Sequence, residues 1–78
     1  MPTVLLWNGY RFYFFSNEGQ EPPHIHVDKG DCTAKFWLAD ASAARAIGFD
    51  AKEIRILSAK VLEEQERMLE AWNGYFGN

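Results

Sequence analysis

Hydrophobic and polar residues alternate along the first part of the chain with the period of two that is typical of β-strands. Two such stretches, residues 3–7 and 10–16, flank Asn8-Gly9, a pair that favours a hairpin because both positions of a type I′ turn need positive φ. This turn predicts the cross-strand pairs Trp7 with Tyr10, Leu6 with Arg11, Leu5 with Phe12 and Val4 with Tyr13. The more apolar face, expected to point to the core, carries Leu5, Trp7, Tyr10, Phe12 and Phe14.

A second alternating region follows a loop that contains Pro22-Pro23. Residues 24–29 and 32–38 predict another hairpin, closed around Gly30-Asp31. Its inward face is expected to carry Ile25, Val27, Ala34, Phe36 and Leu38. Its outward face is expected to carry His24, His26, Asp28, Thr33, Lys35 and Trp37, with His26 beside Lys35 and His24 beside Trp37.

The segment after this hairpin, residues 39–50, reads ADASAARAIGFD. We expect a short helix here, because Asp40 or Ser42 can serve as its cap and Gly48 can end it.

The last third of the chain has the periodicity of an amphipathic helix. Asp50 and Glu53 form a capping-box pattern at its start, and Asn73-Gly74 marks its expected end. The fold class expected for residues 1–78, taken as a single domain, is therefore α+β. We expect a four-stranded, mainly antiparallel sheet of two hairpins, with one long C-terminal helix packed on one face and the other face uncovered.

Composition supports a folded domain, since 47% of the 78 residues are hydrophobic and 15% are aromatic. The net charge of −3 provides no overall attraction for nucleic acid or for a membrane surface. The single cysteine, Cys32, has no partner for an internal disulfide, and the longest apolar run, residues 12–15, is too short to cross a bilayer. We expect a cytoplasmic protein with no membrane partner and no cofactor.

The stretch EPPHIHVDKGD carries the candidate chemistry. Residues two apart on a strand point the same way, so His24, His26 and Asp28 are three possible metal ligands, each roughly 6.5–7 Å further along the strand. A His-x-His pair chelates one ion only if a further ligand arrives from elsewhere, and Glu18 or Glu21 could supply it. The rest of the sequence has no second histidine or cysteine cluster, so we expect no resident metal; if one binds, these are its ligands.

A metal-independent ribonuclease would use the same residues differently. His24 and His26 would be the catalytic acid and base, because an imidazole titrates near neutral pH. Binding would fall to four residues of the same outward face, two cations for phosphate and two aromatic rings for bases: Arg11, Lys35, Tyr13 and Trp37. Each of these residues also has a plain structural role open to it, as a loop-binding histidine, a solubilising cation or a ring that covers apolar surface.

Several blocks of the sequence together resemble a known family: MPTV, GYRFYFFSNEG, EPPHIHV, KFWL and LEAWNGYFG. The chain resembles, from Met1 to Gly77, the small bacterial proteins catalogued as domain of unknown function four-one-six-zero. The resemblance implies a partner encoded by a neighbouring gene, in an arrangement similar to toxin–antitoxin pairs. Leu6 departs from the family, which is usually polar there.

Three hypotheses for function follow. The first is a component of such a two-gene module that binds a protein or RNA through the outer sheet face, with ribonuclease action as a special case. The second is a non-enzymatic protein-interaction domain whose helix or free sheet edge docks its neighbour. The third is a metal-dependent enzyme or sensor that uses the His-x-His pair.

Overall fold

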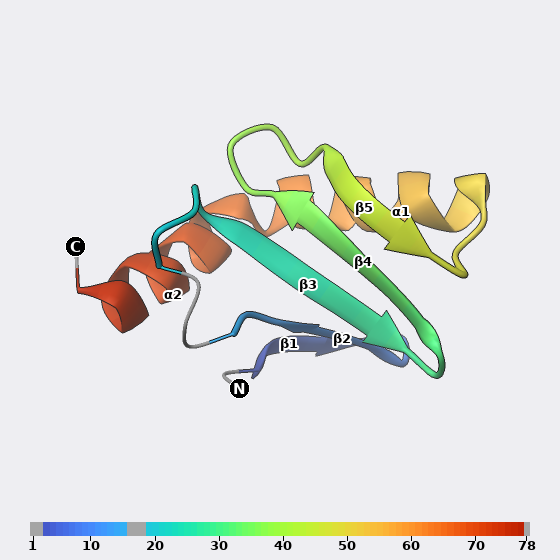
Figure 1. Ribbon diagram of the computed structural model, residues 1–78, viewed down its shortest axis with the longest axis horizontal. Coiled ribbons are helices and arrows are strands. Elements are labelled where there is room, and N and C mark those ends of the chain that lie inside the picture. Colours follow the sequence, from blue (N-terminus) through green and yellow to red (C-terminus); the bar gives the residue numbers. More distant parts are fainter. Residues whose placement is uncertain (1–2, 16–18, 78) are drawn as a thin grey trace.

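The fold is α+β, a five-stranded antiparallel sheet followed by two helices, in a computed structural model that describes residues 3–15 and 19–77. The strands are ordered as in the sequence, β1-β2-β3-β4-β5. The elements are β1 (Thr3–Trp7), β2 (Tyr10–Tyr13), β3 (His24–Lys29), β4 (Cys32–Trp37), β5 (Ala43–Ile47), α1 (Ala51–Glu63) and α2 (Gln65–Phe76). α1 lies on one face of the sheet, and α2 runs on past the end at which β3 begins (Figure 1).

The first hairpin forms as predicted near its turn. Asn8 and Gly9 have φ of 50° and 82°, the left-handed values that this two-residue turn requires. The predicted pairs next to the turn are present, but Tyr13 lies opposite Thr3 instead of Val4 because the register shifts between Thr3 and Leu5. β2 ends at Tyr13, before the predicted limit at residue 16, which is outside the described residues.

The second hairpin has the predicted register throughout, from Lys29 opposite Cys32 to His24 opposite Trp37. The turn begins at Gly30, whose φ is 59°. β3 also pairs antiparallel with β2, so that the two hairpins form one continuous sheet.

The prediction of a short helix in residues 39–50 is wrong, because Ala43–Ile47 forms β5, a fifth strand paired with β4. A turn redirects the chain: the Ala41 N–H donates to the Trp37 carbonyl, and Trp37 N–H donates to the carbonyl of Ser42. The Asp40 carboxylate accepts from Ser42 N–H and Oγ within this turn and caps no helix. Strand pairing along the edge of β4 therefore overrides the helix propensity of alanine.

The single long helix of the prediction is divided in two at Glu64, whose φ and ψ are −99° and 15°. The capping box is present at the start of α1, where Glu53 N–H donates to Asp50 and Asp50 N–H donates to the Glu53 side chain. The Gln65 amide donates to the carbonyls of Leu38 and Ala39, which holds the start of α2 against the loop after β4. The helix extends to Phe76, slightly beyond the predicted end.

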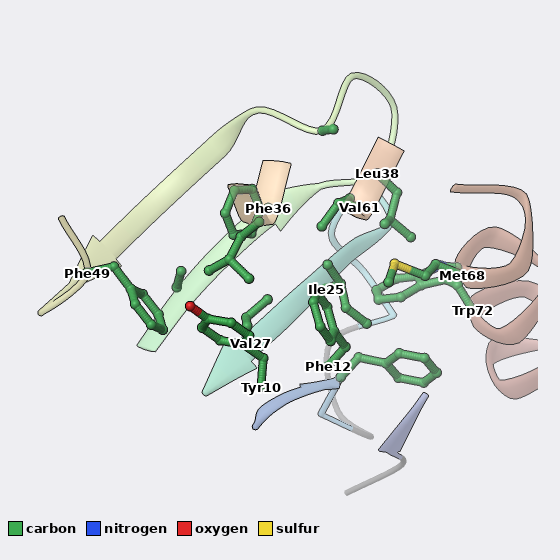
Figure 2. Packing of buried hydrophobic residues seen from close by; sticks show 14 residues of the cluster. Tyr10, Phe12, Ile25, Val27, Phe36, Leu38, Phe49, Val61, Met68 and Trp72 are labelled. Carbon is green, nitrogen blue, oxygen red and sulfur yellow. The ribbon is translucent and has the colours of Figure 1, made fainter. Parts of the chain in front are cut away.

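One hydrophobic cluster joins the inner face of the sheet to both helices. Leu38, Met68 and Trp72 gather at the end beside α2, and Tyr10 and Phe49 lie at the other end (Figure 2). The predicted inward residues of the second hairpin are all buried, as are Phe12 and Phe14 of the first. In the described part of the chain, no helix is long and apolar enough to cross a membrane.

Candidate functional site

His24 and His26 share the sheet face that points away from α1, as predicted, but they are not exposed. The exposed fraction is 0% for His24 and 3% for His26. The prediction of two accessible histidines on a bare sheet face is therefore wrong. The alternation of the strand was identified correctly. The burial was not, because it comes from Phe15, which follows β2, and from Trp72, which lies far from β3 in the sequence.

His24 contacts the Pro-rich loop through a hydrogen bond and packs against the rings of Trp37, Trp72 and His26. Its Nδ1 lies 2.9 Å from the carbonyl oxygen of Pro22, and since a carbonyl only accepts, Nδ1 carries the hydrogen of this bond. The ring lies 5.0 Å from that of Trp72 on α2 and 5.9 Å from that of Trp37, between centroids. A carboxylate oxygen of Glu21 lies 3.9 Å from the same Nδ1. The histidine thus joins the Pro-rich loop to the sheet and to α2.

His26 is enclosed by rings. Tyr13, its partner on β2, stacks on it with centroids 5.5 Å apart, and Phe15 contacts it edge-on at 4.7 Å. The two histidine rings lie 5.1 Å apart and nearly perpendicular. These contacts place both imidazoles inside an aromatic cluster in which neither can meet a large substrate without movement of its neighbours.

Tyr13 belongs to a hydrogen-bonded network at the middle of the same face. Its hydroxyl donates to Asp28 at 2.9 Å, and Thr33 donates to the other carboxylate oxygen at 2.6 Å. Burial and the hydrogen bond to Asp28 raise the pKa of Tyr13 to about 12. The Arg11 guanidinium lies 4.4 Å above the Tyr13 ring, and its Nε donates to Thr3. Tyr13 is only 4% exposed, so its ring supports the face and offers little contact surface.

Lys35 and Trp37 form the outer part of the candidate site. Lys35 Nζ forms an ion pair with Glu21 and lies 4.7 Å from the centroid of the Trp37 ring. Both side chains are partly exposed. The structure therefore brings all of the predicted site residues onto one face. His24, His26 and Tyr13 are buried there, whereas Arg11, Asp28, Lys35 and Trp37 keep partial access to solvent.

The predicted metal ligands do not converge. Across the described residues, no three His, Cys, Asp or Glu side chains lie together as a metal site needs. Asp28 instead binds Tyr13 and Thr33, while Glu21 lies beside Lys35 and His24. Glu18, the other candidate for a further ligand, is outside the described residues.

An open pocket beside the histidines was not predicted from the sequence. Its volume is about 400 Å³, and it is formed by the Pro-rich loop, the end of β4, the loop after β4 and the first half of α2. Its lining residues are Pro22, Pro23, Trp37, Ala39, Asp40 and Leu69. The predicted pairing of His24 with Trp37 was a signal that the Pro-rich loop adjoins Trp37, but nothing in the sequence pattern brings Leu69 to the same place.

Comparison with known proteins identifies the family. The sequence model of a domain of unknown function, DUF4160, matches residues 9–73. No curated protein and no solved structure matches the chain. The matched region runs from the turn of the first hairpin almost to the end of α2, and it includes the buried histidines and every residue that lines the pocket. The chain therefore belongs to the DUF4160 family.

Proposed function

We propose that this chain is the binding component of a two-gene, toxin–antitoxin-like module and that it acts in the cytoplasm by docking a partner protein, the product of the neighbouring gene. The docking region is the end of the sheet around Trp37. This is a protein-interaction function, in which the two histidines shape the surface from beneath and perform no catalysis.

One contrast carries the proposal. The residues that ribonuclease chemistry would need, His24 and His26, are 0% and 3% exposed, whereas the apolar pocket beside them, about 400 Å³ in volume, is open. A general base has to come within hydrogen-bond distance of the proton that it removes, and buried imidazoles cannot approach a ribose hydroxyl. An open pocket lined by Trp, Pro and Leu favours contact with a protein side chain.

Charge also favours a protein partner over RNA. The exposed part of the face offers three cations, Arg11, Lys35 and Arg45, but Glu21 pairs with Lys35 and Asp28 lies opposite Arg11. The chain as a whole carries a net charge of −3. Binding to RNA depends on several cations that can replace the counterions of the phosphates. The free cysteine, Cys32, is consistent with a reducing, cytoplasmic setting.

Co-purification tests the proposal. The tagged chain is co-expressed with the product of the neighbouring gene, and a stable complex is expected on the affinity column and in size-exclusion chromatography. The purified chain is also incubated with structured and single-stranded RNA in the presence of a chelator, and we expect no cleavage. A growth assay with each gene alone and with both together then shows whether the pair behaves as toxin and antitoxin.

Two results would contradict the proposal. One is the absence of any complex between the two gene products. The other is RNA cleavage that is lost in His26→Gln while a folded protein is retained, because Gln keeps a polar side chain but cannot exchange a proton near neutral pH. The second result would restore the ribonuclease hypothesis and would require the aromatic cover of His26 to open.

A further inference from the structure

The pocket beside Trp37 has walls that are tied to one another. Leu38 N–H donates to the Pro23 carbonyl at 3.0 Å, which joins the Pro-rich loop to the end of β4. The Gln65 amide donates to the Leu38 carbonyl at 2.6 Å and to the Ala39 carbonyl at 3.0 Å, which joins that end to α2. Hydrogen bonds thus hold three segments that are distant in the sequence together around the pocket. A ligand that enters it has little backbone to order, so binding loses less conformational entropy.

The interior of the pocket suits an apolar group. Trp37, Leu69 and the two prolines provide most of the lining, and none of their side chains carries a charge. A volume of about 400 Å³ exceeds what one Leu or Phe side chain fills, so a large apolar residue enters together with part of its neighbour. The ligand residue next to this apolar residue must then be complementary in charge to the rim of the pocket.

The rim is acidic. Among the described residues, Asp40 is the only charged one that lines the pocket, and its Oδ1 accepts hydrogen bonds from Ser42 N–H and Oγ. These bonds lower the pKa of Asp40, which keeps the carboxylate ionised, and Oδ2 retains its lone pairs for a cation. On α2, Glu66 and Glu70 lie on either side of Leu69 in the sequence. Neither glutamate forms an ion pair with another residue that the structure describes. The nearby cation Lys35 is already paired with Glu21.

We propose that this pocket recognises a segment of the partner protein in which a large apolar residue is directly followed by Arg or Lys. The apolar side chain lies between Trp37 and Leu69, and the cation binds the Asp40 carboxylate. This inference rests on the proposed function, because it names the chemistry by which the same surface selects its partner. A second copy of the chain is the rival occupant, since Ile54, which is partly exposed on α1, is directly followed by the exposed Arg55.

Three short probes test the pocket without the partner: N-acetyl-leucyl-arginine amide, its leucyl-glutamate analogue and its glycyl-arginine analogue. Binding is followed by NMR through the indole N–H signals of ¹⁵N-labelled protein. The leucyl-arginine probe is expected to shift the Trp37 signal in a saturable way and to bind about tenfold or more tightly than the other two. Trp7, in a separate surface pocket with Ile56 and Ala59, provides the control signal and should not move.

Two variants and a matched control sharpen the test. Asp40→Asn keeps an oxygen that can accept from Ser42, so the fold is retained while the preference for arginine over glutamate is expected to vanish. Ala39→Leu fills the pocket and is expected to abolish the shift of Trp37. Ala59→Leu adds the same side chain to the other pocket and should leave binding unchanged. Equal binding of the three probes, or binding unaffected by Ala39→Leu, would overturn the proposal.

Co-purification with the neighbouring gene product separates this inference from the proposed function. Loss of the complex in Ala39→Leu and Asp40→Asn, with retention in Ala59→Leu, supports both. A complex that survives all three variants overturns the pocket and leaves the proposed function standing. Selective probe binding without any complex overturns the proposed function alone. A dimer of the wild-type chain that becomes monomeric in Ala39→Leu, measured by light scattering, assigns the pocket to a second copy and overturns the partner proposal.

Discussion

Replacement of His24 by alanine is expected to destabilise the protein strongly, even though a histidine on an outward strand face would ordinarily tolerate the change. The side chain is fully buried and contacts the rings of Trp37, His26 and Trp72. Removal of an imidazole leaves a cavity similar to that of a buried Leu→Ala change, which costs about 2–5 kcal/mol. Loss of the hydrogen bond to the Pro22 carbonyl adds about 1 kcal/mol.

The expected total is thus about 3–6 kcal/mol in the free energy of unfolding. A domain of this size has a total stability of roughly 4–12 kcal/mol, so the variant retains only part of it. Urea unfolding followed by far-UV circular dichroism measures the change, and the melting temperature should fall by about 4–8 °C for each kcal/mol lost. His24→Phe keeps most of the packing and loses the hydrogen bond, so it is expected to fall between wild type and His24→Ala.

The control is Arg45→Ala, on the exposed edge strand β5, which should change stability by no more than about 0.5 kcal/mol. If His24→Ala also changes it by no more than about 0.5 kcal/mol, the burial of His24 and its role in joining the loop to α2 are both refuted. If His24→Phe is as damaging as His24→Ala, the hydrogen bond dominates and the cavity estimate is wrong.

Three further predictions concern titration, a glycine and a cap. Because its folded pKa is raised from 10.0 to about 12, Tyr13 stabilises the fold fully below pH 10 and loses this contribution as the pH rises through 12; absorbance at high pH should show a late phenolate that is absent in Tyr13→Phe. Gly48→Ala should destabilise the protein in thermal unfolding, because φ is +89° and the new Cβ would lie 2.8 Å from Cys32 Sγ. Gly74→Ala, with open space on α2, should stabilise it by about 0.5–1 kcal/mol, and the opposite order of the two variants would contradict the backbone geometry. Asp50→Ala should cost about 0.5–2 kcal/mol in urea unfolding through loss of the α1 cap, and no change would show that the cap is unimportant.

The hairpins and their faces could be predicted because their signals are local. Asn8-Gly9 and Gly30 specify turns, and once a turn is fixed, the period of two decides which face each residue occupies. The Asp50 cap is likewise a property of four consecutive residues. For the same reason the order of the residues on the outer face, with His26 beside Lys35, was predicted correctly.

The accessibility of those residues could not be predicted in the same way. The exposure of His26 depends on Phe15, and that of His24 depends on Trp72, which lies on the helix that runs past the end of the sheet (Figure 1). Exposure is a property of what covers a face, and the alternation of a strand carries no information about its cover. The fifth strand could not be predicted for a similar reason, because Ala43–Ile47 becomes extended only by pairing with another strand, β4.

The sequence by itself thus determined the turns, the alternation of both hairpins, the cap of α1 and the set of residues that share the outer face. Tertiary structure alone decided that the two histidines are buried and that a pocket opens beside Trp37. The physical reason is that turns and caps are made by neighbouring residues, whereas burial and cavities are made by segments that meet only when the core forms. Leu69 and Pro23 line one pocket because the hydrogen bonds of Leu38 and Gln65 hold three such segments together.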